Sequence, residues 1–307
     1  MSRQQWPTGL ITALVTPMTD AGIDADATRN LVERQVQAGV GGVLVAGGTG
    51  EHGVLSLDER RELTRVVAEA VAGRIPFVVQ SGALSTRDAV ALSQDAQEIG
   101  AAGLLLPAPF GEAVNWREKK AFYAEVNGAV SVPIMLYNTH SAGIMNLAQI
   151  EELAQLSNVS AVKHSSNDAT LLGDLIAWSR TADFAVYTGW DDQLAPAVIA
   201  GAHGALLGAG NVVPELIVEV LNLCYQRQLG AEFDEAWARL RPFLRFIGES
   251  ENYVSVVKLA TTLRGVDVGE VRRPYLMPSE DERAALAEVL DALGASQAQP
   301  AATEAVR

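Results

Sequence analysis

The amino-acid sequence predicts an α/β protein built on a (β/α)8 TIM barrel with a C-terminal helical extension. Two observations favour this fold: short apolar runs recur eight times along the chain, and a longer amphipathic segment follows each of them. The third observation is length, since 307 residues exceed the roughly 250 that such a barrel needs. An open, doubly wound sheet fits less well, because the pattern never breaks into two halves and no Gly-x-Gly-x-x-Gly motif follows the first strand.

The expected strands are unbroken apolar runs rather than alternating ones, which is typical of parallel strands covered on both faces. In chain order they span residues 10–16, 42–46, 77–80, 103–106, 133–137, 159–163, 185–188 and 204–207. The segments between them repeat apolar residues at helical spacing. These helices span residues 25–38, 56–72, 85–99, 115–129, 146–155, 170–179, 193–200 and 214–228. The second helix begins at Ser56 with Glu59 three residues later, which is a capping box.

The chain after the eighth strand is helical throughout. Amphipathic segments cover residues 231–247 and 254–263, and a second capping box at Ser279 begins a last helix that ends near Leu293. The expected division is a barrel through its eighth strand in residues 1–212, the last barrel helix and the C-terminal helices in 213–293, and a disordered tail in 294–307. The tail is rich in Ala, Gln and Pro, a composition that favours fraying.

Composition narrows the class of partner. The net charge of −14 argues against nucleic acid and anionic membrane surfaces. The first residues contain no apolar signal region, and no uninterrupted apolar stretch is long enough to span a membrane. A single cysteine, Cys224, excludes an internal disulfide, and no zinc-type spacing of His or Cys occurs. We therefore expect a cytoplasmic protein without a bound metal.

Lys163 is the residue with the most unusual context. It ends the apolar run of residues 159–163, where burying an ammonium group without a partner is costly. Loss of the proton removes that cost and leaves a nucleophilic amine, which can form a Schiff base with a carbonyl substrate. The alternative is a lysine that reaches solvent or pairs with a carboxylate, and position alone favours this plainer reading.

Two further strand ends carry functional groups. Residues 47–51, Gly-Gly-Thr-Gly-Glu, follow the second strand, and the free N–H groups of such a turn can hold a carboxylate, while Thr49 adds a hydroxyl. Tyr137 ends the fifth strand and offers a phenol for proton transfer. Alone, the turn is as readily an ordinary one, and position alone favours a core tyrosine for Tyr137. Because the carboxyl ends of all barrel strands meet at one mouth, we expect both to face Lys163. Carboxylate holder, proton carrier and amine are the parts that 2-keto acid chemistry through an imine requires.

These motifs, at these separations, resemble the dihydrodipicolinate synthase / N-acetylneuraminate lyase family from about Gly9 to Leu293. The resemblance implies a barrel with a helical extension, a homotetramer built as a dimer of dimers, and no metal or organic cofactor. It implies that Lys163 forms the Schiff base, that Tyr137 relays protons and that Thr49 is catalytic. The substrate-binding residues that it implies are Gly48, Gly50, Ser165, Gly189, Asp191, Leu206 and His140.

The chain also departs from the family pattern. Gly48 stands where the family commonly has Thr or Ser, and Ala142 stands where the synthases carry a carboxylate-binding arginine. The segment 107–111 lacks the tyrosine pair of the synthases. Losing a bidentate carboxylate clamp predicts a different second substrate, held in a pocket lined by His140, Ser165, Asn167, Trp190 and Asp191.

Three functions stay open from the sequence. The first is a class I lyase or aldolase that acts on a 2-keto acid, with pyruvate as substrate or product and an aldehyde as the second component. The second is a hydro-lyase or deaminase that works through the same imine on a keto-deoxy sugar acid or a related keto acid. The third is a barrel that binds sugar acids without turning them over.

Overall fold

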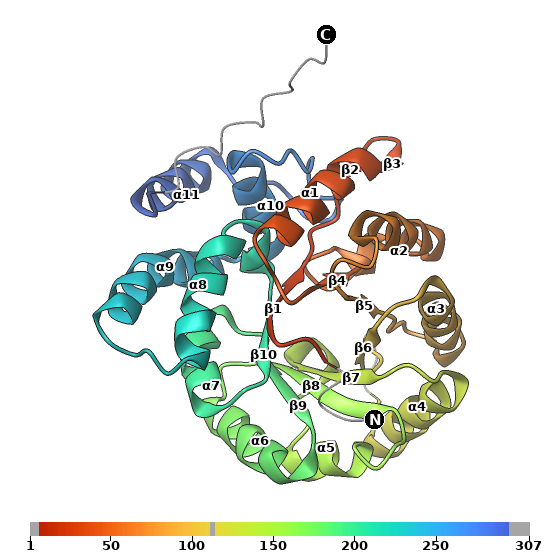
Figure 1. The fold of residues 1–307 in the computed structure, drawn as a ribbon. Coiled ribbons are helices and arrows are strands. Elements are labelled where there is room, and N and C mark those ends of the chain that lie inside the picture. The colour runs from red at the N-terminus through yellow and green to blue at the C-terminus, as the bar shows by residue number, and fades with distance from the viewer. Residues whose placement is uncertain (1–5, 111–113, 295–307) are drawn as a thin grey trace.

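The computed structural model describes residues 6–110 and 114–294 and shows the expected closed barrel (Figure 1). Eight parallel strands follow one another around the barrel in the order β1-β10-β9-β8-β7-β6-β5-β4, and β4 pairs with β1 to close it. The barrel strands are β1 (Gly9–Ala13), β4 (Gly42–Val45), β5 (Phe77–Gln80), β6 (Gly103–Pro107), β7 (Ile134–Thr139), β8 (Val159–Ser165), β9 (Ala185–Thr188) and β10 (Gly204–Leu207). The prediction of the fold is confirmed.

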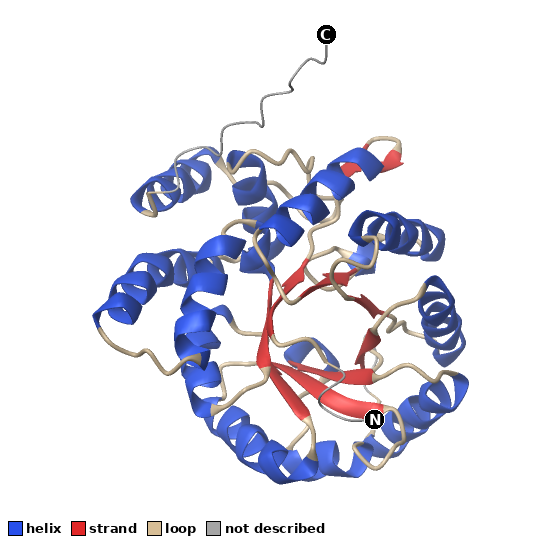
Figure 2. Ribbon diagram, viewed as in Figure 1, coloured by secondary structure: helices blue, strands red, loops and turns tan. Residues whose placement is uncertain are grey.

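Helices surround the barrel on its outside, as Figure 2 shows in blue around the red strands. They are α1 (Ala25–Gln37), α2 (Leu57–Val71), α3 (Thr86–Ile99), α4 (Trp116–Ala129), α5 (Leu147–Leu153), α6 (Ala169–Ala182), α7 (Leu194–Ala200) and α8 (Pro214–Tyr225). The capping box at Ser56 is present, since its hydroxyl accepts from the Glu59 amide and the Glu59 carboxylate accepts from the Ser56 amide. Helices α1 to α7 each join one barrel strand to the next, and α8 follows the last strand, β10.

Side chains alternate between the barrel interior and the helical layer. On β8, Ala161 belongs to the interior cluster and Val162 to the outer one, so that Lys163 points inward. His164 points to the outer layer, as strand alternation predicts, and its Nδ1 lies 3.2 Å from Asn138 Nδ2. Tyr137 packs on the interior cluster and pairs in register with Lys163. The sheet itself thus places the phenol beside the amine.

The C-terminal helical extension is also confirmed. It consists of α9 (Ala231–Glu249), α10 (Tyr253–Leu263) and α11 (Glu280–Ala292), which lie against one side of the barrel in blue in Figure 1. The capping box predicted at Ser279 is present. The division of the chain at residues 212 and 293 stays a prediction. The tail was expected over residues 294–307, and residues 295–307 of it lie outside the described residues.

The first and sixth barrel strands differ from their predicted bounds for a local reason. Strand β1 ends at Ala13 because the next residues turn toward other loops: the Val15 amide donates to Asn211 Oδ1, and Thr16 Oγ1 donates to the Gly50 carbonyl. A small hairpin that was not predicted follows, formed by β2 (Met18–Thr19) and β3 (Gly22–Ile23). Strand β8 continues past Lys163 because it stays paired with β7 as far as the Thr139–Ser165 position.

No helix within residues 6–110 and 114–294 is long and apolar enough to cross a membrane.

Candidate active site

Lys163 is nearly buried at the open end of the barrel. Its side chain is 7% exposed, and its Nζ lies 4.6 Å from the centre of the Tyr137 ring. Among the described residues it makes no ion pair, and its polar contact is a hydrogen bond with Tyr137. A Cβ at position 189 would come within 2.4 Å of Lys163 Cε, so Gly189 leaves the space that the lysine side chain occupies. The amine is therefore held in place without a carboxylate that neutralises it.

Tyr137 lies in an environment that favours its ionised form. Burial alone would raise the pKa of this phenol, but the charge of Lys163 and hydrogen bonds with Ser165, Thr139 and Lys163 act in the opposite direction. The result is a pKa below the ordinary value of a tyrosine. A phenol with a lowered pKa that touches a lysine is suited to exchange protons with groups bound at that lysine.

The glycine-rich turn follows β4 and reaches the same cavity. The Glu51 amide donates to the Gly48 carbonyl at 3.0 Å, which closes the turn, and Glu51 itself has a left-handed φ of 59°. A Cβ at Gly48 would meet nothing within 4 Å, so this residue faces open space. Thr49 is 9% exposed and lies against Gly208, which follows β10. The backbone of Gly48 and Thr49 is thus accessible to a small anion.

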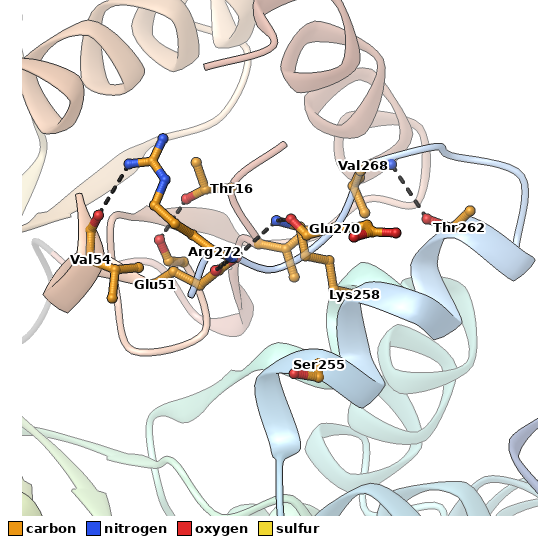
Figure 3. Close-up of polar contacts among 12 residues, drawn as sticks. Thr16, Glu51, Val54, Ser255, Lys258, Thr262, Val268, Glu270 and Arg272 are labelled. Carbon is orange, nitrogen blue, oxygen red and sulfur yellow. Dashed lines mark hydrogen bonds and ion pairs between the residues drawn. The ribbon is translucent and has the colours of Figure 1, made fainter. Parts of the chain in front are cut away.

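A buried ion pair fixes this turn from the C-terminal extension (Figure 3). Lys258 on α10 approaches Glu51 with Nζ 2.8 Å from Oε1, and both side chains are 0% exposed. The second oxygen of Glu51 accepts from the Arg272 amide, and Lys258 Nζ also donates to the Glu270 carbonyl. Both carboxylate oxygens of Glu51 accept a hydrogen bond, and Lys258 Nζ donates two, which offsets the cost of burying the two charges. The left-handed Glu51 is held by two contacts from the C-terminal extension, one from Lys258 and one from the Arg272 amide.

Arg272 strengthens the same attachment at the surface. Its guanidinium contacts both carboxylate oxygens of Glu59, at 2.7 Å and 2.9 Å, and donates to the Val54 carbonyl. The hydrogen bond from Arg272 is the largest of the causes that lower the pKa of Glu59 to about 2. The segment after the turn is thus tied to the extension at two points.

The cavity above Lys163 has a volume of about 400 Å³. Nine of the predicted residues line it, and they are Lys163, Tyr137, Thr49, Gly48, Ser165, Gly189, Asp191, Leu206 and His140. Gly50 does not line it, because this residue packs below the turn against Leu14 and Thr16. Asn167 is exposed and is likewise absent from the described lining, whereas Trp190 is part of it.

Sequence reasoning missed part of the outer wall of this cavity. The further lining residues are Thr139, Asp192, Gly208, Gly248, Glu249, Tyr253 and Val254. Tyr253 is the most informative of them, because it begins α10 and brings a second phenol into the cavity from the C-terminal extension. No local signal in the sequence marks it, since its role depends on how the extension packs on the barrel.

Tyr253 interacts with Asp191, which follows β9. Burial raises the pKa of the Asp191 carboxyl to about 7, against the lowering effects of a hydrogen bond with Tyr253 and of the Lys163 charge. Burial and the Asp191 charge raise the pKa of Tyr253 well above its ordinary value. Asp191 can therefore change its protonation state near neutral pH.

Within the described parts of the chain, no group of three or more His, Cys, Asp or Glu side chains is arranged to hold a metal ion. The polar groups at the cavity are instead an amine, two phenols, hydroxyls and carboxyls.

Comparisons with known proteins agree with this architecture. The sequence pattern of the Dihydrodipicolinate synthetase family matches residues 6–293. A 4-hydroxy-tetrahydrodipicolinate synthase of Clostridium perfringens is 31% identical over 297 residues, which cover 93% of this chain and 98% of that protein. Its counterpart in Caldicellulosiruptor bescii is 31% identical over 287 residues, 92% of this chain and 96% of the relative.

Solved structures show the same likeness. YagE, a prophage protein of the dihydrodipicolinic acid synthase family from E. coli K12 that was solved in complex with pyruvate, matches with a TM-score of 0.88 and 27% identity, over 94% of this chain and 98% of that chain. Dihydrodipicolinate synthase from Aquifex aeolicus matches with a TM-score of 0.89 and 26% identity, over 95% and 99% of the two chains. The family resemblance seen in the sequence is confirmed, and this chain belongs to the Dihydrodipicolinate synthetase family.

Proposed function

We propose that this member of the family is a class I lyase or aldolase that binds a 2-keto acid as an imine on Lys163, with pyruvate as substrate or product. The observation that carries the proposal is the state of Lys163: it is 7% exposed, makes no ion pair among the described residues, and touches the phenol of Tyr137 at the floor of a cavity. A buried amine without a carboxylate partner is a nucleophile for ketones.

The neighbouring groups supply what imine formation needs. The amine adds to the ketone carbon, and the oxygen leaves as water after it has gained protons from Tyr137. The amides near Gly48 and Thr49 hold the carboxylate of the keto acid, and the Thr49 hydroxyl joins the proton relay. The protonated imine then accepts the electron pair of the C3–C4 bond of the bound substrate, so that this bond breaks. In the reverse direction the enamine attacks the aldehyde and the same bond forms. Ser165, Leu206 and Gly189 shape the cavity around the bound keto acid.

The second component is a neutral, hydroxylated aldehyde. Ala142, where the synthases carry their arginine, is buried and lies outside the described cavity lining. The lining residues of the outer wall include three carboxyl groups, Asp191, Asp192 and Glu249, and no arginine. Such a wall repels a second carboxylate and accepts hydrogen bonds from hydroxyls. His140 is the side chain that we assign to the hydroxylated tail.

A second reaction uses the same imine. A hydro-lyase or deaminase acting on a keto-deoxy sugar acid would expel water or ammonia instead of breaking a carbon–carbon bond. The carboxyl of Asp191 favours this alternative, because a group with a pKa of about 7 can protonate a departing hydroxyl. Free pyruvate as product indicates aldol cleavage, and a dicarbonyl product without pyruvate indicates elimination.

Borohydride trapping with pyruvate tests the proposal. We expect one reduced adduct on the peptide that contains Lys163, and none in Lys163→Ala, which also loses all turnover. Lys120→Ala is the matched control, because Lys120 is exposed and pairs with Glu152 on the surface. Absence of label on wild-type Lys163 contradicts both enzyme functions. An adduct without turnover of any aldehyde or sugar acid supports the third reading, a barrel that only binds.

We also propose that the protein works as a cytoplasmic homotetramer, a dimer of dimers, as the family resemblance implies. Sedimentation equilibrium on the full chain measures the oligomeric state directly, and a monomer at micromolar concentration contradicts it.

A further inference from the structure

Two proton carriers, Tyr137 and Asp191, line the same cavity as Lys163. Strands β7, β8 and β9 are neighbours, and Lys163 on β8 pairs in register with Tyr137 on one side and Tyr187 on the other. Asp191 follows β9, just beyond Gly189, whose backbone touches the Lys163 side chain. The charge of Lys163 acts to lower the pKa of both Tyr137 and Asp191, so both lie within electrostatic reach of the amine.

The environment of Asp191 favours a proton on its carboxyl. The side chain is 7% exposed, and its Oδ1 is buried without a hydrogen-bond partner among the described residues. A buried carboxylate oxygen that accepts no hydrogen bond is costly, whereas a protonated carboxyl has less charge to satisfy. The raised pKa of Asp191, about 7, agrees with this geometry.

Tyr253 positions this carboxyl from the C-terminal extension. Its phenol hydrogen-bonds with Asp191, and its ring packs on Gly208. A Cβ at position 208 would lie 2.7 Å from the Tyr253 hydroxyl and 2.9 Å from Thr49, so only glycine leaves room for the phenol. The contact between Tyr253 and Asp191 is therefore built into three separate elements.

The surroundings of Tyr137 and Asp191 shift the pKa values of these two groups in opposite directions. Charge and hydrogen bonds lower the pKa of Tyr137, while burial raises that of Asp191. Titratable groups whose environments move their pKa values apart are candidates for separate roles in proton transfer. The other charged or titratable groups that face Asp191 or its short helix are Lys163, His140, Asp192, Arg245, Glu249 and Tyr253.

We infer that Asp191, positioned by Tyr253, carries the proton to and from carbon 3 of the keto acid bound to Lys163, while Tyr137 serves the oxygen atoms. In the exchange direction, the C3–H bond of the pyruvate imine breaks, its proton passes to the Asp191 carboxylate, and the electron pair forms the C2–C3 double bond of the enamine. In the cleavage direction, the C4 hydroxyl gives its proton to Tyr137, the C3–C4 bond breaks to give the aldehyde and the enamine, and C3 takes the proton from Asp191. This inference rests on the imine of the proposed function.

Deuterium exchange into pyruvate tests it without a second substrate. In D2O, the wild-type protein is expected to exchange the methyl hydrogens of pyruvate, as measured by NMR. Asp191→Asn is expected to trap pyruvate with borohydride as wild type does but to exchange about 10²–10⁴-fold more slowly, as for a lost general base. Asp174→Asn, an exposed carboxyl on α6, is the matched control and keeps the wild-type rate.

The pH profile gives a readout that a structural role would not change. Exchange needs Asp191 ionised, so its rate rises with pH through the pKa of this carboxyl. The hydrogen bond from Tyr253 lowers that pKa, and Tyr253→Phe is therefore expected to move the rise to higher pH. The inference is overturned by wild-type exchange in Asp191→Asn, by loss of its borohydride adduct, or by an unchanged profile in Tyr253→Phe. A wild-type protein that traps no pyruvate overturns the proposed function instead.

Discussion

Two buried lysines, Lys163 and Lys258, lie in the same half of the molecule but in opposite electrostatic situations. Lys258 is completely buried and contacts the carboxylate of Glu51 and the carbonyl of Glu270. Lys163 is almost as buried but contacts the phenol of Tyr137 and lines a cavity. Among the described residues, Lys258 thus has a carboxylate at hydrogen-bond distance and Lys163 makes no ion pair.

The difference shows that burial alone does not identify a reactive lysine. A buried ammonium is tolerable when its charge is matched, and Lys258 with Glu51 is such a matched pair. Lys163, which makes no ion pair among the described residues, is the amine that we propose to react, and it lines the cavity. The two lysines are nevertheless connected, because the pair at Lys258 holds the turn that presents Gly48 and Thr49 to the cavity.

The matched substitutions Lys163→Met and Lys258→Met give the largest contrast. Lys163→Met is expected to abolish adduct and turnover but to change the free energy of unfolding by only about 1 kcal/mol, because it removes no ion pair. Lys258→Met leaves the Glu51 carboxylate buried and unpaired, and is expected to destabilise the fold by roughly 3–5 kcal/mol. Urea denaturation of both variants measures the two effects.

A double variant separates charge from packing in this contrast. Adding Glu51→Gln to Lys258→Met removes the unpaired charge while its side-chain carbonyl can still accept from the Arg272 amide. We expect the double variant to be more stable than Lys258→Met alone. Equal stability of the two would mean that the buried charge was not the cause.

Tyr137→Phe tests whether the phenol beside Lys163 transfers protons, as we propose. Removing the phenol hydroxyl leaves the ring against Lys163 Nζ, so the fold should be retained. Turnover should fall by about 10²–10⁴-fold, as expected for a lost general acid or base. Steady-state assays together with thermal unfolding distinguish this result from misfolding. A near-wild-type rate in Tyr137→Phe would refute the proton-transfer role.

The comparison of the two lysines also shows which parts of the site could be predicted from the sequence. Lys163, Tyr137 and the turn at Gly48 were predictable because each ends an apolar strand, and the carboxyl ends of barrel strands meet at one mouth. Their convergence on one cavity follows from fold class and local sequence together. No knowledge of distant contacts was needed for this part of the site.

Contacts between segments that are far apart in the chain could not be predicted from the sequence. Nothing local marks Tyr253 or Lys258 as partners of Asp191 and Glu51, because α10 reaches the barrel mouth only through tertiary packing. Gly50 was predicted to bind substrate because it belongs to the glycine-rich turn. The backbone instead directs it toward Thr16 and away from the cavity. Motif membership predicts the segment and not the direction of each residue.

Glu59→Gln gives the smallest expected effect. It tests the partly exposed pair of Arg272 and Glu59, which joins the C-terminal extension to the barrel near the buried pair of Lys258 and Glu51. The pKa of Glu59 in the folded protein is about 2, against an ordinary value of 4.5, chiefly because Arg272 hydrogen-bonds to it. Its stabilising contribution is therefore fully present above pH 4.5 and is lost as the pH falls from 4.5 toward 2. Because the pair is partly exposed, we expect about 1 kcal/mol or less at neutral pH. Unfolding free energies of wild type and Glu59→Gln should thus converge as the pH is lowered to 2, and a difference that stays constant would place the effect in packing instead of charge.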